Sequence, residues 1–276
     1  MNGSPRTTRS SDGTTIAFDR SGEGPAVILV GGAFQHRAFD PAMAELAALL
    51  APRFTVLHYD RRGRGDSGDT PPYAVEREVE DIAALVEAAG GSASLFGSSS
   101  GAALALDAAR SGLPILRLAL YEPPFLVDDS HPPLPEDYLE RLTELVAAGR
   151  RGDAVALFMT KAADLPDEVV AGMRQTPTWP GFESVAHTLP YDAAVMGDTV
   201  NGDPASLARW ASVTAPALVL DGGESPAWAG AAARALVEIL PDARRRTLAG
   251  QTHAVAPEVL APVLDEFFAA PTPRGS

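Results

Sequence analysis

The run Gly97-Ser98-Ser99-Ser100-Gly101 has the residue types and spacing of a catalytic serine. It follows an apolar stretch with strand character and precedes an Ala/Leu-rich stretch with helical character, so the chain must reverse sharply at its centre. Ser98 and Ser100 are alternatives, but only Ser99 has a glycine two residues away on both sides, which lets strand and helix close up. We predict Ser99 as a nucleophile; otherwise the run is a Ser/Gly-rich turn that caps a helix.

A serine hydroxyl needs a base, and histidine is the usual one. The chain has five histidines, and only His253 lies on a loop between a predicted late strand and the predicted final helix. His58 falls inside a predicted buried strand, which favours a packing role. We therefore predict His253 as the base, with a surface histidine as the alternative.

Hydrolysis at a carbonyl also needs two backbone N–H groups that bind the developing oxyanion. One should come from Ser100, the residue after the predicted nucleophile. The other should come from the small residues after the apolar strand at 26–30, where Gly32 and Ala33 are equal candidates. Alone, this segment would be an ordinary Gly-Gly turn.

The acid that orients the histidine is the least obvious member. The loop after a predicted strand at 217–220 offers Asp221 and Glu224, but Ser225 stands where an acid would normally fall. Glu122 follows the preceding predicted strand, at the same sheet edge as Ser99. Burying it among Tyr121 and two prolines is costly without a partner, and His253 could be that partner. We favour Glu122, keep Glu224 and Asp221 as alternatives, and note that Glu122 could instead be a rim carboxylate.

These residues sit in an alternation of short apolar strands and longer helical patterns, an order that implies a parallel sheet wrapped by helices. Predicted strands are 15–18, 26–30, 54–59, 94–96, 116–121, 217–220 and 244–248, and predicted helices are 40–50, 74–89, 99–110, 228–240 and 257–268. Between the predicted strands 116–121 and 217–220 no convincing strand occurs. This segment contains predicted helices at 135–150, 153–161, 166–174 and 181–195. We predict a core formed by residues 1–122 and 205–276, and an inserted helical cap, residues 123–204.

Four motifs together resemble one family. They are Val30-Gly31-Gly32, the run from Asp60 to Ser67, Gly97–Gly101 and the late His253. The chain is similar to proteins of the α/β-hydrolase fold with a helical cap, which implies a mostly parallel sheet flanked by helices. It departs from them in having Gly31-Gly32 where His-Gly is frequent, and in lacking an acid at the commonest place.

Some branches of that family, including certain haloalkane dehalogenases and the fungal zearalenone lactonases, carry a glutamate after the strand that follows the elbow helix. The lactonase branch also resembles this chain at Ser99-Ser100-Gly101 and at Phe39-Asp40. The resemblance implies a Ser99–His253–Glu122 triad and points towards lactones as substrates.

A serine nucleophile favours acyl transfer, whereas the dehalogenases and epoxide hydrolases of this fold use aspartate. We expect hydrolysis of a carboxylic ester or lactone of a small, largely apolar molecule through an acyl-enzyme, with no metal and no cofactor. C–C bond hydrolysis or other cofactor-free chemistry is an alternative, and a non-catalytic ligand-binding protein is another. Candidate pocket residues are Phe34, His36, Phe125, Trp179 and Tyr191.

Composition excludes several other classes. With 22 Lys and Arg against 36 Asp and Glu, the formal charge is −14, which argues against binding nucleic acid or an anionic membrane. Zero cysteine excludes disulfides and thiolate metal sites. No apolar run approaches the roughly 20 residues of a membrane span, and residues 1–13 lack the apolar stretch of a secretion signal. We expect a cytoplasmic protein that is a monomer or a homodimer.

Overall fold

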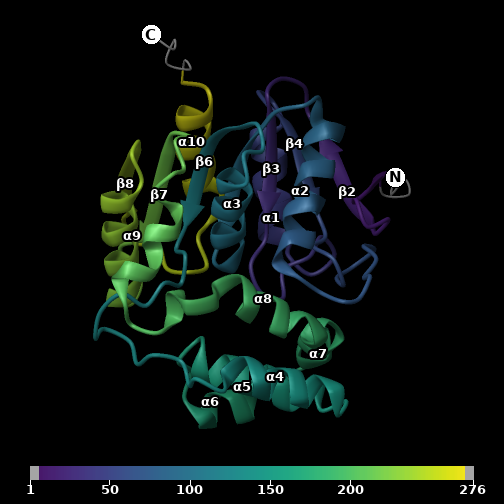
Figure 1. Ribbon diagram of the computed structural model, residues 1–276, viewed down its shortest axis with the longest axis vertical. Helices are drawn as coiled ribbons and strands as arrows, with labels where there is room; N and C mark the ends of the chain where they lie inside the picture. The colour runs from purple at the N-terminus through teal and green to yellow at the C-terminus, as the bar shows by residue number, and fades with distance from the viewer. Residues whose placement is uncertain (1–5, 271–276) are drawn as a thin grey trace.

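A computed structural model describes residues 6–270. Residues 1–5 and residues 271–276 lie outside it, so the first five residues of the segment 1–13, which lacks the apolar stretch of a secretion signal, are not described. Its centre is one sheet of eight strands in the order β1-β2-β4-β3-β5-β6-β7-β8 (Figure 1). The strands are β1 (Arg6–Arg9), β2 (Thr15–Ser21), β3 (Ala26–Val30), β4 (Thr55–Tyr59), β5 (Ala93–Ser98), β6 (Ile115–Tyr121), β7 (Ala217–Gly222) and β8 (Ala243–Leu248). From β4 to β8 all neighbours are parallel, whereas β1 and β2 pair antiparallel at one edge. The predicted fold class is thereby confirmed.

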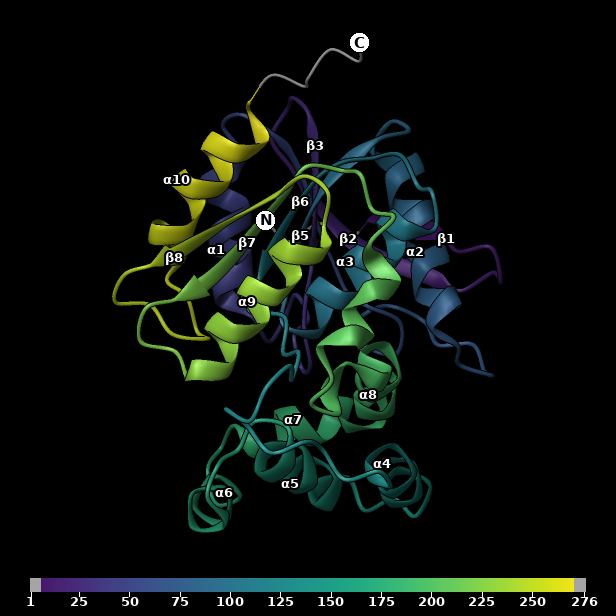
Figure 2. The same cartoon turned by 60° about the vertical axis from the view of Figure 1, so that its left-hand side comes forward.

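Helices cover both faces of the sheet, as Figure 2 shows. The helices of the core are α1 (Pro41–Leu50), α2 (Val75–Ala89), α3 (Ser100–Arg110), α9 (Ala227–Ile239) and α10 (Pro257–Phe268). Apolar side chains of α1 and α10 pack on one face, and those of α2, α3 and α9 pack on the other. All five residues of β3 and of β4 are buried, because a parallel strand in the middle of such a sandwich is covered on both sides.

The sequence patterns locate the buried elements best. The strand at 26–30 and the helix at 257–268 have the predicted bounds, and Asp40 caps α1 as expected, since its carboxylate accepts a hydrogen bond from Met43 N. The short strand β1 was not predicted. Its residues are Arg-Thr-Thr-Arg and mostly exposed, so no apolar pattern marks it.

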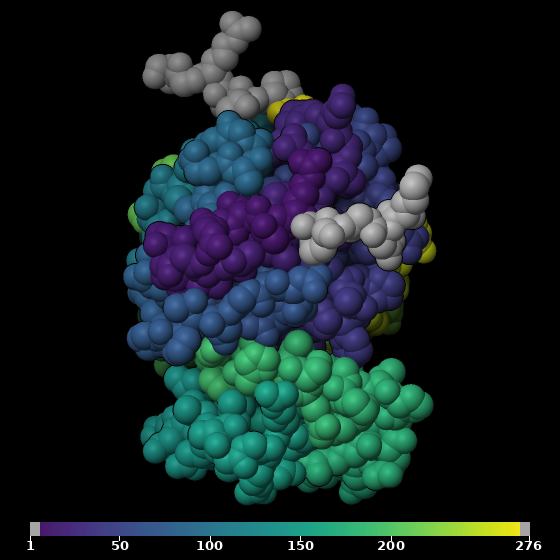
Figure 3. All heavy atoms as spheres, turned by 90° about the vertical axis from the view of Figure 1, so that its right-hand side faces the viewer, coloured from purple at the N-terminus to yellow at the C-terminus, as the bar shows by residue number. Residues whose placement is uncertain are grey.

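Between β6 and β7 the chain leaves the sheet and forms the cap (Figure 1). Its helices are α4 (Tyr138–Ala147), α5 (Arg151–Lys161), α6 (Asp167–Met173), α7 (Trp179–Val185) and α8 (Leu189–Met196). The single helix expected at 181–195 is divided into α7 and α8 by a 3₁₀ turn at Ala186–Thr188, and Pro190 lies in the first turn of α8. Figure 3 shows the cap as a block against one end of the core, with the segment around α8 at the junction. Within residues 6–270 no helix is both long and apolar enough to cross a membrane.

Candidate active site

Ser99 stands at the turn between β5 and α3 with a strained backbone, at φ 55° and ψ −129°. Its N–H donates to the carbonyl oxygen of Tyr121 on the neighbouring strand at 2.9 Å, which ties the turn to β6. A Cβ on Gly97 would lie 2.6 Å from Ala102 Cα, and one on Gly101 would lie 2.3 Å from Val30 O. Both glycines are therefore required by the close approach of strand and helix, and Ser99 is left partly exposed at the sheet edge.

Gly101→Ala should destabilise the protein, because the new methyl group meets the backbone of β3 rather than a side chain that can move. Overpacking of this kind typically costs ~1–3 kcal/mol, and a backbone obstacle places the cost near the upper end. Thermal unfolding followed by circular dichroism measures it. The matched control is Gly172→Ala in α6, where a Cβ meets nothing within 4 Å and the melting temperature should stay the same or rise. Equal melting temperatures for Gly101→Ala and the native chain would contradict this packing argument.

The structure brings together Glu122, which precedes the cap in the sequence, and His253, which follows it. His253 Nδ1 lies 2.7 Å from Glu122 Oε2, and the glutamate is 0% exposed whereas the histidine side chain is 46% exposed. The other glutamate oxygen, Oε1, accepts hydrogen bonds from Gly222 N at 2.7 Å and from Ser225 Oγ at 2.5 Å. Nδ1–H thus donates to the carboxylate, and Nε2 is the ring nitrogen left to take a proton.

The two alternative acids are placed elsewhere. Asp221 receives two hydrogen bonds of 2.7 Å from Arg245, through Nε and Nη2, which link β7 to β8. Glu224 is exposed on the loop after β7. Ser225, which occupies the usual position of the acid, instead donates to Glu122.

The Gly32 and Ala33 N–H groups differ in their surroundings. Gly32 N–H donates to Gln35 Oε1 at 2.5 Å, and the Gln35 amide is held in turn by Asp40. Within residues 6–270, neither Ala33 N–H nor Ser100 N–H donates to a protein acceptor. Gly32 also packs closely behind the serine, since a Cβ on it would lie 2.8 Å from Ser99 Cβ. Of the three predicted oxyanion donors, only the N–H groups of Ala33 and Ser100 are therefore free of a protein acceptor in the described part of the chain.

A pocket of about 270 Å³ lies beside the elbow, on the α1 and α10 side. Its lining residues are Gln35, Asp40, Ala42, Met43, Leu46, Phe96, Ser98, His253, Ala254, Val255, Pro257 and Leu260. Ser98, which precedes Ser99, and His253 both line this pocket, but within residues 6–270 no hydrogen bond joins the Ser99 hydroxyl to His253. Sequence reasoning singled out Ser98 and His253 but missed the apolar lining residues, since these were absorbed into the predicted core pattern.

None of the five predicted pocket residues lines this pocket, and two of them are buried in apolar cores. Phe125 is 0% exposed and packs against Trp210 in the core, with ring centroids 4.9 Å apart. Trp179 is buried in the core of the cap, where its indole N–H donates to Glu183 at 2.9 Å. Both follow the general preference of large aromatic side chains for the interior.

The other three lie at or near the junction of core and cap. Phe34 has φ 64° and packs edge-on against Phe158 and Phe182 of the cap. His36 stacks on Phe39, and burial lowers the pKa of its imidazole. Tyr191 stacks on Tyr73 with ring centroids 3.8 Å apart. Phe34 and Tyr191 thus join cap to core, and the predicted contact of all three residues with substrate stays a prediction.

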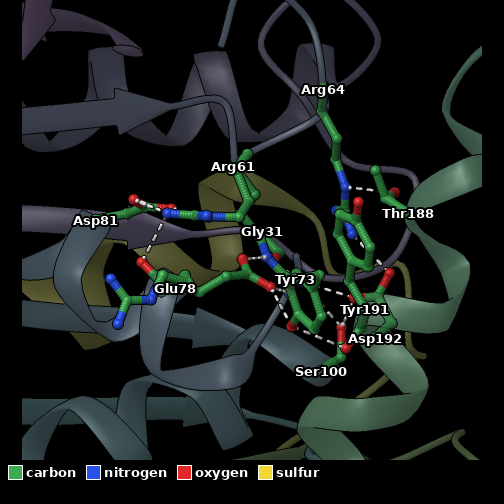
Figure 4. Close-up of polar contacts among 12 residues, drawn as sticks. Gly31, Arg61, Arg64, Tyr73, Glu78, Asp81, Ser100, Thr188, Tyr191 and Asp192 are labelled. Carbon is green, nitrogen blue, oxygen red and sulfur yellow. Dashed lines mark hydrogen bonds and ion pairs between the residues drawn. The ribbon is translucent and has the colours of Figure 1, made fainter. Parts of the chain in front are cut away.

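A buried cluster of charged side chains that the sequence did not reveal contacts Ser100, the residue after the predicted nucleophile (Figure 4). Arg61 forms two hydrogen bonds of 2.7 Å with Glu78 and a third, of 2.6 Å, with Asp192 of α8. Arg64 forms a 2.6 Å hydrogen bond with the other Asp192 oxygen. Burial alone would raise the pKa of Asp192, but Arg64 and Arg61 outweigh it and hold that pKa below its ordinary value. The arginines belong to the quoted motif at 60–67, whereas nothing in the helical pattern marked Asp192.

Metal ligands are not gathered in the same way. The part of the chain between residues 6 and 270 contains no group of three or more His, Asp or Glu side chains arranged to hold a metal ion.

Comparison with known proteins agrees with this architecture. Residues 26–264 match the model of the alpha/beta hydrolase family. The crystal structure of an alpha/beta hydrolase from Sphaerobacter thermophilus DSM 20745 is 61% identical, superimposes with a TM-score of 0.88, and is covered completely by 96% of this chain. The chain therefore belongs to the alpha/beta hydrolase family, and we describe it as a hydrolase.

More distant structures share the fold alone. A hydrolase from Pseudomonas aeruginosa PA01 is 23% identical with a TM-score of 0.70, over 98% of this chain and 100% of that one. A thermophilic esterase from Thermogutta terrifontis is 23% identical with a TM-score of 0.68, over 96% of this chain and 98% of that one. No curated protein matches the chain.

Proposed function

We propose that this protein is a serine hydrolase that cleaves a carboxylic ester or lactone of a small, largely apolar molecule. One observation carries the proposal: His253, held by a buried glutamate at 2.7 Å, lines the same pocket as Ser98, the residue before the strained Ser99. Ser99, His253 and Glu122 would then form the triad that their order in the chain and the family resemblance suggest.

The reaction would use groups whose positions are described above. Ser99 Oγ attacks the carbonyl carbon and passes its proton to His253 Nε2, while Glu122 stabilises the imidazolium. The N–H groups of Ala33 and Ser100 bind the oxyanion, aided by the positive end of the α3 dipole. The imidazolium gives its proton to the departing alkoxide, and the same histidine then takes a proton from the water that hydrolyses the acyl-enzyme.

The pocket beside His253 supports a small apolar group as part of the substrate. Met43, Leu46, Phe96 and Leu260 are among its apolar lining residues, and about 270 Å³ is below the size of a typical drug-sized site. The formal charge of −14 disfavours anionic substrates at low salt. A short-chain or aromatic ester, or the corresponding lactone, fits these limits.

A fluorophosphonate probe tests the nucleophile directly, because it phosphonylates an activated serine. We expect one adduct per chain by intact-protein mass spectrometry, located on Ser99 by peptide mapping and absent from Ser99→Ala. A native chain that is folded but takes up no probe would point to the ligand-binding alternative.

The reaction class needs a separate measurement, since C–C bond hydrolysis can use the same three side chains. Initial rates should be compared for p-nitrophenyl esters of increasing chain length, for aromatic lactones and for diketones. We expect short esters or lactones to be hydrolysed fastest. Turnover of diketones alone would replace ester cleavage with C–C cleavage.

A further inference from the structure

Asp192 is a cap residue whose carboxylate reaches the catalytic turn of the core. It lies on α8, is 2% exposed, and accepts three hydrogen bonds, all from core residues. Figure 4 shows the carboxylate between Ser100 and the two arginines, where the cap meets the core. Its contacts lead to both N–H groups that are free to bind an oxyanion.

The first contact is direct. Ser100 Oγ donates to Asp192 Oδ1 at 2.7 Å, and Ser100 is also the residue whose N–H would bind the oxyanion in the proposed reaction. Ser100 is also the first residue of α3, so this hydrogen bond ties the N-terminus of that helix to the cap. Loss of the bond would free the Ser100 side chain to adopt other rotamers beside the nucleophile.

The second contact acts through Arg64. Its Nη2 donates to Asp192 Oδ2 at 2.6 Å, and its Nη1 donates to the carbonyl oxygen of Gly32 at 2.5 Å. That carbonyl belongs to the same planar peptide unit as Ala33 N–H, and the two point in opposite directions across it. An arginine fixed on the carbonyl therefore fixes the direction of the N–H and polarises it as a donor.

Charge balance explains why the Asp192 carboxylate must stay in contact with the two arginines. Arg61 and Arg64 are each 1% exposed, and the acids that contact them are Glu78 and Asp192. Glu78 is fully engaged with Arg61 through both oxygens. Without Asp192, Arg64 would keep only neutral partners, Gly32 O and Thr188 Oγ1 among them, and would be a buried cation without a counter-charge.

We propose that Asp192 is a positioning residue through which the seated cap aligns both oxyanion donors, Ser100 by its hydroxyl and Ala33 by way of Arg64 and the Gly32 carbonyl. This inference rests on the proposed serine hydrolase function. It also makes α8 a fixed part of the active site, so that opening of the cap while the site is competent must leave this helix in place.

Asp192→Asn tests the proposal, because it keeps the shape of the side chain and removes its charge. We expect kcat for p-nitrophenyl acetate to fall by about 10- to 100-fold with KM changed less than about threefold, since removing one oxyanion donor outright costs ~10²–10³ in kcat. Inhibition by an aryl trifluoromethyl ketone, whose adduct with serine carries an oxyanion, should weaken by a similar factor. A purely structural defect would not separate kcat from KM in this way.

The matched control is Asp198→Asn, a nearby cap aspartate whose side chain is 63% exposed and which pairs with Arg209 at 3.4 Å. It should leave kcat and ketone inhibition unchanged. Ser100→Ala gives a second reading if Asp192→Asn does not fold, because it keeps the backbone N–H and removes only the hydroxyl contact; we expect a roughly tenfold lower kcat.

The outcomes separate the two levels of inference. If the native chain is active and folded Asp192→Asn keeps the same kcat and the same ketone inhibition, the positioning role alone is overturned. If Asp192→Asn fails to fold, the same result with Ser100→Ala overturns it. A folded native chain that neither hydrolyses esters or lactones nor reacts with fluorophosphonate overturns the proposed function and the positioning role with it.

Discussion

Glu122→Gln should lower kcat for ester hydrolysis by about ten-thousand-fold, the order found when the acid of a triad becomes an amide. The amide oxygen of the new side chain can still accept from Gly222 N, so the fold around it should survive. Its NH₂ group, however, would face His253 Nδ1 and force that nitrogen to act as an acceptor. The proton then sits on Nε2, and the ring can no longer take one from Ser99.

The controls are the two acids that the sequence left open. Glu224→Gln changes an exposed side chain and should leave kcat within about twofold. Asp221→Asn breaks the ion pair with Arg245 and should lower the melting temperature with little effect on kcat. Initial rates with p-nitrophenyl acetate and thermal melts measure both properties. A larger loss of kcat in either control than in Glu122→Gln would sink the assignment of the acid.

Ser99→Ala should have the largest effect of any single change, lowering kcat on the order of a million-fold, because removal of the nucleophile from a working triad leaves only binding and oxyanion stabilisation. Its fold should persist, although alanine must also adopt the left-handed backbone at φ 55°. Active-site titration before the assay keeps traces of native enzyme from setting the measured rate.

Ser98→Ala is the matched control for this change. Ser98 is the neighbouring hydroxyl, lies on the pocket wall and ends β5, so its loss should reduce kcat by much less than that of Ser99. If instead Ser98→Ala abolished turnover and Ser99→Ala kept it, the nucleophile would be the wrong serine.

The parts of the molecule that follow repeating local rules were predictable from the sequence. The apolar strand at 26–30 is buried on both faces, and the Gly-x-Ser-x-Gly run must make a tight turn wherever a strand meets a helix. The pairing of Glu122 with His253 followed from a similar argument, because a buried carboxylate needs a partner and one histidine followed the last strand.

What the sequence could not supply depended on contacts between distant segments. The residue types of Phe125 and Trp179 favoured a pocket, but type does not tell which side chains turn inward, and both are buried in apolar cores. Asp192 gave no signal, since one aspartate in a short helix is usually solvated, and only the meeting of α8 with residues 61 and 64 makes it special. The engagement of Gly32 N–H by Gln35, three residues on, is local and could have been considered from the sequence.

The position of Glu122 before the cap also bears on how the chain is completed during synthesis. Its carboxylate takes its three hydrogen bonds from Gly222, Ser225 and His253, the nearest of them 100 residues later and the histidine 131 later. A nascent chain that has released β6 and the whole cap therefore still carries an acid with none of these donors, and burying it there is unfavourable. The segments that carry these donors, β7 and the loop after β8, must be synthesised before Glu122 can form its native contacts, so we expect the proposed active site to be among the last parts of the molecule to form.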